Sequence, residues 1–446
     1  LAFREAHDNR SGAVRRETQL KKWSRAKKEA LISGDFEKLK EIADLLYATN
    51  SEGKILAMHS LAEGGIAVGI SKMIFGNHIG ADITSDLDIF QERYFNFLIE
   101  VKNSESLPAA LAAEKIGQTH NEHCLRVNGE AVCIDTLIAA WTGTLESTYA
   151  THIEPAHSEI ETFSYKGGAA TQHSKFKTKN SRPRVIVPSF PGTNSEYDSA
   201  KAFNQAGGAA HIEVFRNLTP QAVEESLAAL AKRISESQIL MIPGGFSAGD
   251  EPDGSGKFIA TVLRNPMVSD AIMDLIKNRD GLVLGICNGF QALIKTGLVP
   301  YGEIRDPQAG APTLTFNDLG RHIATYATTR ISSTLSPWLA NTEVGDLHNI
   351  PFSHGEGKFH ASDEEIRALA ANGQIATQYT DLEGNPSMAI EHNPNGSLYA
   401  IEGITSPCGR VLGKMGHTER RGTNVGKNIP GNKHQPLFKA GVAYFS

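Results

Sequence analysis

The stretch Gly281-Leu-Val-Leu-Gly-Ile-Cys-Asn-Gly-Phe-Gln291 decides the fold. Its first five residues form a short apolar run that predicts a buried strand, and residues 288–296 have the spacing of a helix. Cys287 is therefore predicted to lie on a sharp turn from strand into helix. We expect the glycines on both sides to permit a strained backbone there, and the helix N-terminus to favour the thiolate. The same arrangement exposes the nucleophile of many serine hydrolases.

Short apolar runs alternate with longer helical patterns around this stretch. Strands are predicted at 184–188, 212–215, 239–243 and 282–285, and helices at 195–206, 220–236, 255–278 and 288–296. This alternation predicts an α/β fold in which a parallel sheet is flanked by helices. In such sheets ligands bind beyond the carboxyl ends of the strands, so the residues directly after each strand are the candidates for a site.

The N-terminal part has a different pattern and predicts a smaller α+β domain. A helix is predicted at 18–47, a strand at 92–101 and a β-hairpin at 124–134, where Asn128-Gly129 supplies the positive φ angles of a tight turn. Glycine, lysine, serine and proline gather between 161 and 182, as in a linker. We therefore expect a first domain at 1–160, a linker at 161–182 and a second domain at 183–446.

The composition bounds the class of protein. The 446 residues are enough for two or three domains, and a formal net charge of -6 is too mild to indicate nucleic acid or a membrane as a partner. No apolar run approaches the roughly 18 residues of a membrane span. The four cysteines lack the paired spacing of a zinc site or a disulfide scaffold, which predicts no metal site and a location in the cytoplasm. Because the chain begins at Leu1 in what resembles the middle of a helix, we expect it to be a piece of a longer chain.

A cysteine nucleophile needs a base and a group that orients the base, and two segments offer both. His417-Thr-Glu419 follows the apolar run 410–415, and His354-Gly-Glu356 has the same spacing. In extended chain, residues two apart point the same way, so either glutamate could hold its histidine ring. Spacing alone does not choose between the two pairs.

Amide hydrolysis also requires donors that face the oxyanion of the tetrahedral intermediate. The glycine-rich stretch at 243–250, Pro-Gly-Gly-Phe-Ser-Ala-Gly-Asp, follows a predicted strand and can turn backbone N–H groups toward a pocket. We expect one donor at Gly245 or Phe246 and another at Asn288. The stretch lacks the Lys-Ser/Thr ending of a P-loop, which argues against a phosphate-binding role for its glycines.

The motif G-I-C-N-G-F-Q at 285–291 resembles the G-x-C-x-G-x-Q nucleophile turn of class I glutamine amidotransferases, whose fold is flavodoxin-like. Together with P-G-G-F-S-A-G-D, F-S-H-G-E-G-K-F at 352–359 and G-H-T-E-R at 416–420, it is similar to the glutaminase domain of phosphoribosylformylglycinamidine synthase of the large single-chain type. The resemblance assigns the triad to Cys287, His417 and Glu419. It implies that His354 and Glu356 line the same pocket, where with Gln291 they would hold the ends of the substrate.

The segment M-H-S-L-A-E-G-G-I-A-V-G-I at 58–70 is similar to a motif in the synthetase part of the same family, which is related to aminoimidazole ribonucleotide synthetase. Ser60 stands where the family has an acidic residue, while Glu63, Gly64 and Gly65 match. The resemblance implies that L-glutamine is hydrolysed through a thioester on Cys287, with no cofactor in the glutaminase domain. Ammonia would then pass to a synthetase site in the rest of the same polypeptide, which uses ATP and Mg²⁺ to convert formylglycinamide ribonucleotide to its amidine.

Two rival functions stay open at this point. One is another cysteine hydrolase on the same fold, such as an intracellular peptidase, against which the synthetase-like segment at 58–70 argues. The other is a degenerate amidotransferase domain that only binds or scaffolds. The presence of Cys287, His417 and Glu419 argues against that alternative.

Overall fold

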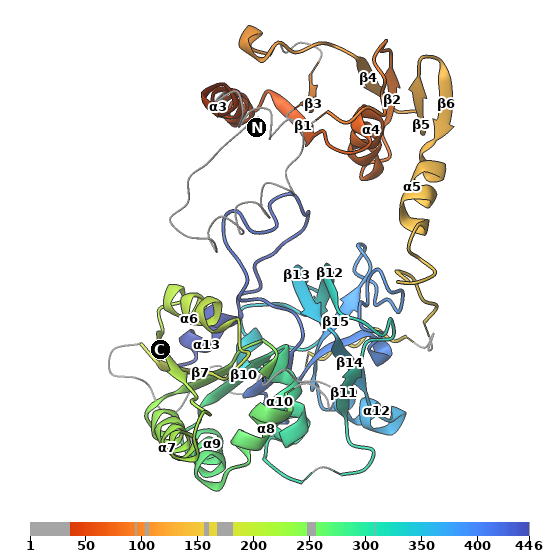
Figure 1. The fold of residues 1–446 in the computed structure, drawn as a ribbon. Coiled ribbons are helices and arrows are strands. Elements are labelled where there is room, and N and C mark those ends of the chain that lie inside the picture. Colours follow the sequence, from red (N-terminus) through yellow and green to blue (C-terminus); the bar gives the residue numbers. More distant parts are fainter. Residues whose placement is uncertain are drawn as a thin grey trace. The chain divides into compact units, whose positions relative to one another are not determined.

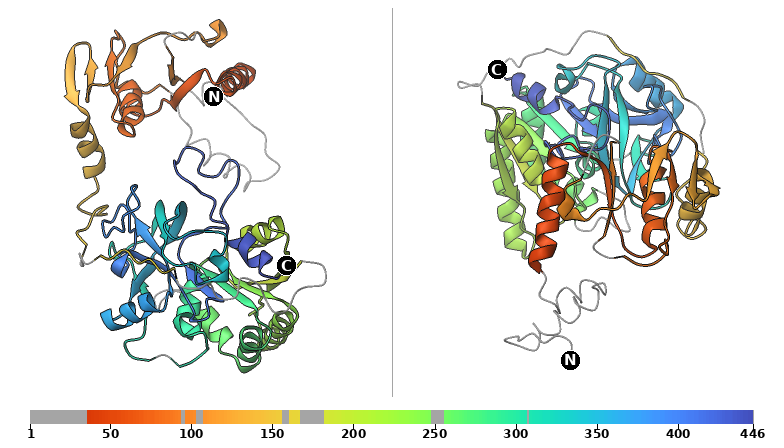
Figure 2. Two further views of the ribbon diagram at one scale, coloured as in Figure 1. Left: turned by 180° about the vertical axis from the view of Figure 1, so that it is seen from behind. Right: turned by 90° about the horizontal axis from the view of Figure 1, so that it is seen from above.

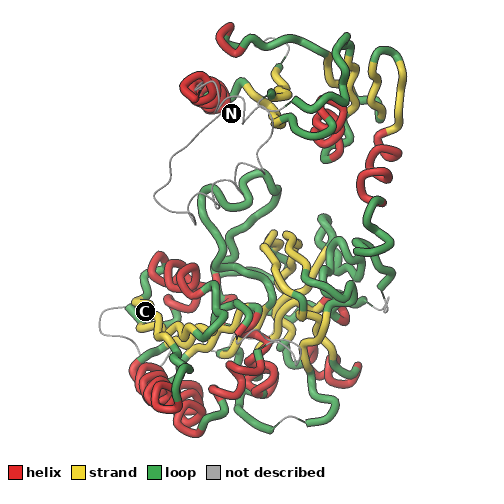
Figure 3. The backbone as a smooth tube through the Cα atoms, viewed as in Figure 1, coloured by secondary structure: helices red, strands yellow, loops and turns green. Residues whose placement is uncertain are grey.

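The computed structural model describes residues 36–93, 96–102, 107–155, 160–166, 182–247, 256–306 and 308–445. The chain forms two compact units, Leu1–Ala150 and Thr151–Ser446. Figure 1 shows the fold and labels most of the helices and strands, and Figure 3 colours the same view by secondary structure.

The second unit is built on one nine-stranded sheet with the order β13-β12-β15-β16-β17-β10-β9-β7-β8. Five neighbouring strands are parallel, namely β8 (Ala209–Val214), β7 (Arg184–Ser189), β9 (Ile239–Ile242), β10 (Leu282–Ile286) and β17 (Val411–Lys414). Antiparallel pairing extends this half through β16 (Ile401–Thr405), β15 (Ile375–Thr380), β12 (Ile323–Ile331) and β13 (Leu347–His354). A separate pair joins β11 (Thr313–Phe316) to β14 (Glu356–His360).

Helices cover both faces of the parallel half. Figure 1 shows α6 and α13 on one side of β7 and β10, with α7, α8 and α9 on the other, and Figure 2 gives two further views. The helices of this unit are α6 (Glu196–Gln205), α7 (Pro220–Glu236), α8 (Lys257–Leu263), α9 (Pro266–Lys277), α10 (Asn288–Thr296), α11 (Leu298–Tyr301), α12 (Asp363–Ala371) and α13 (Leu437–Ala443), with 3₁₀ turns η3 (Pro337–Leu339) and η4 (Leu398–Ala400). All residues of β9 and β10 are buried, as expected of strands covered on both faces.

The predicted α/β fold is confirmed, with two differences. The sheet is mixed rather than wholly parallel, because four strands from the C-terminal half add to it in antiparallel fashion. The single helix predicted at 255–278 is two helices. Asn265 caps the second one by accepting a hydrogen bond from the Met267 N–H at 3.1 Å, and Pro266 cannot continue the first because it lacks an N–H.

The first unit contains two small sheets. One pairs β1 (Ile55–Ser60) with β3 (Phe97–Val101), and the other has the order β4-β2-β5-β6 from β4 (Gly117–His120), β2 (Gly80–Ile83), β5 (Cys124–Val127) and β6 (Glu130–Cys133). Its helices are α3 (Phe36–Ser51), α4 (Gly65–Phe75), α5 (Ile134–Gly143) and the 3₁₀ turn η1 (Ala109–Leu111). The predicted hairpin is confirmed, with φ of 50° at Asn128 and 94° at Gly129. Residues 18–35 of the predicted helix 18–47 lie outside the described residues.

The first unit ends at Ala150, ten residues before the predicted boundary at 160. Residues 160–166, which we assigned mostly to the linker, belong to the second unit because their backbone is hydrogen-bonded to it. The Phe163 N–H donates to Gln378 Oε1 at 2.9 Å, and the Tyr165 N–H donates to the Ser332 carbonyl at 2.8 Å. The rest of the predicted linker, at 167–181, lies outside the described residues.

The turn at Cys287 is strained, and the cysteine itself carries the strain. Its φ of 52° and ψ of -107° place it where L-residues are uncommon, whereas Gly285 and Gly289 have no positive φ. Our expectation that the glycines supply conformational freedom is therefore wrong. They supply space instead, because a Cβ on Gly289 would overlap the Ile242 carbonyl oxygen and one on Gly285 would lie 2.6 Å from Leu293 Cδ1.

Replacing Gly289 with alanine should therefore destabilise the second unit. A Cβ there meets backbone of β9, which cannot rotate away, so we expect a loss of about 1–3 kcal/mol, typical of overpacking. Urea unfolding measures this loss. Gly355→Ala is the matched control, because its Cβ would find its nearest neighbour, in His322, at 3.9 Å. Equal stability of both variants would contradict the tight approach of α10 to β9.

Candidate active site

Cys287 lies at the carboxyl end of β10, at the N-cap of α10. Its N–H donates to the Lys414 carbonyl at 2.9 Å, and its carbonyl accepts from the Gln291 N–H at 3.0 Å. The sulfur lies 3.6 Å from the carbonyl oxygen of Ser353 on β13, and 4% of the residue is exposed. The thiol is thus fixed by its backbone at the edge where the parallel strands end.

His417 and Glu419 lie just after the neighbouring strand β17 and form a buried pair. His417 Nδ1 and Glu419 Oε1 are 2.6 Å apart, and both side chains are almost fully buried. Nε2 of His417 is also buried, with no hydrogen-bond partner among the described residues. The carboxylate holds the ring by one nitrogen and leaves the other for proton transfer.

The charge on His417 depends on its two neighbours. Burial opposes protonation of the ring, but the Glu419 carboxylate and then Cys287 outweigh it and raise the pKa of His417 to about 9. Burial would likewise raise the pKa of Glu419, and the charge of His417 lowers it instead. At neutral pH the pair is therefore an imidazolium and a carboxylate.

Gly244, directly after Pro243 at the end of β9, lies against both His417 and Cys287. A Cβ on Gly244 would lie 2.6 Å from His417 Cε1 and 3.5 Å from Cys287 Cβ. The ring and the nucleophile therefore converge on the same small space, and only glycine fits beside them. The sequence pattern places Gly244 in a glycine-rich loop but does not indicate this role.

A buried ion pair supports the turn that carries His417, and the sequence did not indicate it. Lys414 Nζ lies 3.3 Å from Glu402 Oε1, with both side chains at most 1% exposed. Lys414 also donates to the Gly416 carbonyl at 2.9 Å and to Thr418 Oγ1 at 3.0 Å, while Glu402 accepts from the Gly416 N–H at 2.6 Å. The residues on both sides of His417 are thus tied to one buried pair.

One of the expected oxyanion donors is already engaged in a hydrogen bond. The Phe246 N–H donates to the Gly192 carbonyl at 2.9 Å, and this existing hydrogen bond argues against Phe246 as an oxyanion donor. Gly245, with φ of 152°, and Asn288, at the first position of α10, stay the predicted donors. The amide of Asn288 is held by the Ser247 N–H, which donates to Oδ1 at 3.3 Å.

The residues expected to hold substrate lie beside the triad but differ in how free they are. Gln291 uses both ends of its amide within the protein, accepting from Asn288 Nδ2 at 3.0 Å and donating to the Glu356 carbonyl. It bridges α10 to β14, and its contact with substrate stays a prediction. Glu356 is buried at the start of β14, directly across the short turn from His354.

His354 is the more available group. Both of its ring nitrogens are buried without a hydrogen-bond partner among the described residues. Burial, and then the charge of His417, lower its pKa to about 3, so the ring is neutral. A neutral imidazole can donate one hydrogen bond and accept another, as binding of a polar substrate requires.

Two further observations concern possible metal and membrane contacts. Among the described residues, one group has the geometry to hold a metal ion, namely His78, His123 and Asp135, all exposed and all in the first unit. His123 already pairs with Asp135 at 3.0 Å. None of the described helices combines the length and the apolar character needed to cross a membrane.

Comparison with known proteins matches each unit to a family. The model of the CobB/CobQ-like glutamine amidotransferase domain matches residues 182–445, and that of the C-terminal domain of AIR synthase related proteins matches residues 11–124. Phosphoribosylformylglycinamidine synthase subunit PurQ of Methanococcus maripaludis is 34% identical over 244 residues, 53% of this chain and 82% of that protein. The subunit of the same name from Dehalococcoides mccartyi is 34% identical over 242 residues, 54% of this chain and 86% of that one. The solved structure of PurLQS from Thermotoga maritima covers 59% of this chain and 100% of that chain, at 24% identity and a TM-score of 0.43.

The pairing of His417 with Glu419 gives a pH-dependent prediction. In Glu419→Gln, burial is no longer outweighed by a carboxylate, so the pKa of His417 should fall from about 9 to below the ordinary value of about 6.5. NMR of the histidine rings across this pH range measures the change. Because the raised pKa adds stability below about pH 6.5 that is lost as pH rises through about 9, the stability gap between wild type and variant should narrow over that window.

Glu213→Gln is the control for this titration, because it removes the carboxylate of another His-x-Glu pair, His211 and Glu213, which is far less buried than His417 and Glu419. It should leave the titration of His417 unchanged. An unchanged titration of His417 in Glu419→Gln would contradict the assignment of Glu419 as the orienting group.

Proposed function

The chain belongs to the family of CobB/CobQ-like glutamine amidotransferase domains, as the glutaminase part of a phosphoribosylformylglycinamidine synthase, and from this premise we propose that its second unit hydrolyses L-glutamine at Cys287. The observation that carries the proposal is the convergence of His417 and Cys287 on Gly244, with Glu419 bonded to the far side of the ring. A nucleophile, a base and an orienting carboxylate are together the requirement for covalent catalysis of acyl transfer.

The mechanism we propose has two steps, formation of a thioester and its hydrolysis. The Cys287 sulfur, its proton held by His417, attacks the side-chain amide carbon of glutamine, and the N–H groups of Gly245 and Asn288 stabilise the resulting oxyanion. His417 returns the proton to the departing nitrogen, which leaves as ammonia, and a γ-glutamyl thioester remains on Cys287. Water, deprotonated by His417, then cleaves the thioester and releases glutamate. Glu419 stabilises the imidazolium in both steps.

The residues proposed to bind substrate come from β13, β14 and α10. We propose that His354, Glu356 and Gln291 hold the amino and carboxylate ends of glutamine. The unpartnered ring nitrogens of His354 support this role, because buried polar atoms without partners are costly unless a ligand satisfies them. His322 Nε2 lies 3.2 Å from Oγ of Ser353, whose carbonyl oxygen is close to the sulfur, and the rings of His322 and Phe246 are 5.8 Å apart.

The ammonia would serve a synthetase reaction elsewhere in the same assembly. We propose that it passes, without release to solvent, to a site where ATP and Mg²⁺ activate formylglycinamide ribonucleotide. The match of residues 11–124 to the AIR synthase C-terminal domain supports an origin of the first unit in that synthetase. In this unit the motif at 58–70 forms a strand, a turn at Gly64 and Gly65 with φ of 76° and 55°, and the start of α4. We expect the chain alone to hydrolyse glutamine slowly, because the family couples the two reactions.

Two histidine variants separate catalysis from binding. His417→Gln should lower kcat for glutamine hydrolysis by at least about 10²-fold, the usual contribution of a general base. His354→Ala should instead raise KM about tenfold, with kcat changed little, because it removes substrate contacts and leaves the triad intact. Steady-state measurement of glutamate release determines both constants.

His348→Gln is the matched control, since His348 is another buried, neutral histidine on β13 whose pKa burial lowers to about 4. It should change neither constant. If the His354 variant lost turnover and the His417 variant lost only affinity, the triad assignment would be wrong. Hydrolysis of other primary amides as fast as glutamine would favour the rival cysteine hydrolase, and no turnover in the presence of a working synthetase would favour the scaffold.

A further inference from the structure

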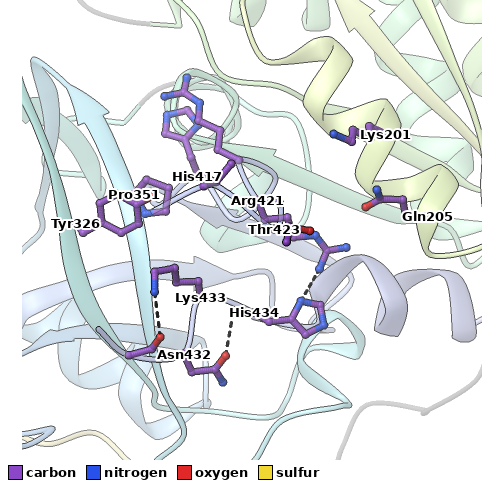
Figure 4. Close-up of a pocket in the computed structure, with 14 residues that line it drawn as sticks. Lys201, Gln205, Tyr326, Pro351, His417, Arg421, Thr423, Asn432, Lys433 and His434 are labelled. Carbon is purple, nitrogen blue, oxygen red and sulfur yellow. Dashed lines mark hydrogen bonds between the residues drawn. The ribbon is translucent and has the colours of Figure 1, made fainter. Parts of the chain in front are cut away.

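A cavity of about 670 Å³ lies beside the loop that follows His417 (Figure 4). Residues of α6, β12, β13 and the segment 417–434 line it. It shares His417 with the active site, but Cys287, Gly245 and Asn288 do not line it. The cavity is therefore distinct from the place where the thioester forms, and the glutaminase reaction gives it no role.

The charged side chains that line this cavity are all basic. Its lining contains Lys201, Arg420, Arg421 and Lys433 together with His434, and it contains no aspartate or glutamate. None of Lys201, Arg421 and Lys433 forms an ion pair with any residue that the structure describes. Such a concentration of unpaired cations in a concave site attracts anions.

Neutral groups hold the cations in place. Arg421 Nη1 lies 2.6 Å from His434 Nδ1, and its guanidinium lies 5.5 Å from the Phe438 ring. Lys433 Nζ donates to the carbonyls of Ile429 and, at 3.3 Å, of Gly431. Figure 4 shows Arg421 and His434 pointing toward each other at one side of the cavity, with Lys433 near the opposite side. Arg421 and Lys433 are thus held in place around the cavity, and neither forms an ion pair with a carboxylate among the described residues.

Arg420 connects this cavity to the catalytic pair. Its guanidinium donates to Ser195 Oγ at 3.0 Å and to Asn194 Oδ1 at 3.3 Å, and its Nε lies 4.0 Å from Glu419 Oε1.

Burial lowers the pKa of Arg421, and burial followed by the charges of Arg421 and Lys439 lowers the pKa of His434. Both shifts reflect the cost of holding a positive charge in this partly buried place, which a negatively charged ligand would reduce.

We propose that this cavity binds the phosphate group of a small phosphorylated ligand. A dianionic phosphate offsets the charge of Lys201, Arg421 and Lys433 better than a single carboxylate does. Arginine binds the phosphate oxygens through a pair of parallel N–H donors, and lysine adds a mobile point charge. The volume is within the range of small-molecule sites, and Thr423 and Asn432 offer polar contacts to the rest of the ligand.

Calorimetric titration of the full chain at constant ionic strength tests this proposal. The probes are ribose 5-phosphate, inorganic phosphate, and ribose as the uncharged control. We expect binding of both phosphates and none of ribose. Ribose 5-phosphate binding more tightly than inorganic phosphate would identify a phosphate monoester as the ligand class, and equal affinity would identify free phosphate.

Two variants locate the site. Lys201→Gln combined with Lys433→Gln should weaken phosphate binding at least tenfold, and Arg421→Gln should do the same. Because Arg421 also packs near Phe438, the double lysine variant keeps the test valid if the arginine variant does not fold. Lys232→Gln, on the exposed side of α7, is the matched control and should bind like wild type. Absence of phosphate binding by wild type, or equal affinity in the double lysine variant, would overturn the proposal.

Discussion

The arrangement of the second unit depends on the ends of three neighbouring strands, β9, β10 and β17. These ends can meet because the residue after β9 that faces the other two is a glycine. Gly244 follows β9, Cys287 follows β10 and His417 follows β17, and the sheet order makes these strands adjacent. Glycine at 244 leaves room for the imidazole and the nucleophile, and glycine at 289 lets α10 approach the backbone of β9. The strained φ of Cys287 is maintained because the surrounding close-packed core leaves no alternative.

In this site, ion pairs offset the cost of burying charged side chains. His417 and Glu419 are buried together, and so are Lys414 and Glu402, so each charge has an opposite partner at short distance. The two pairs share the turn at 414–419, since Lys414 also bonds to Gly416 and Thr418. His354 lies close to the same charges without a carboxylate partner and is neutral. The same environment thus holds one charged and one neutral histidine.

The sequence predicted the parts of this structure that depend on local pattern. The apolar runs at 184–188, 239–243 and 282–285 became β7, β9 and β10, and the motif around Cys287 became the turn from β10 into α10. The antiparallel half of the sheet was not predicted, because pairing direction depends on distant partners rather than on periodicity. Nor could spacing reveal the buried pair of Lys414 and Glu402, or that the Phe246 N–H is already bonded, since both depend on tertiary contacts. The family resemblance, rather than spacing, chose His417 over His354.

The central claim is that the Cys287 sulfur forms a covalent bond to the γ-carbonyl of glutamine with His417 as its base. Acid-quenched mass spectrometry of the chain mixed with isotopically labelled glutamine tests it most directly. The account predicts a γ-glutamyl adduct on the peptide that contains Cys287, formed rapidly in wild type and much more slowly in a variant lacking the His417 ring. An adduct on Cys124, Cys133 or Cys408, or glutamate release with no adduct on any cysteine, would contradict it.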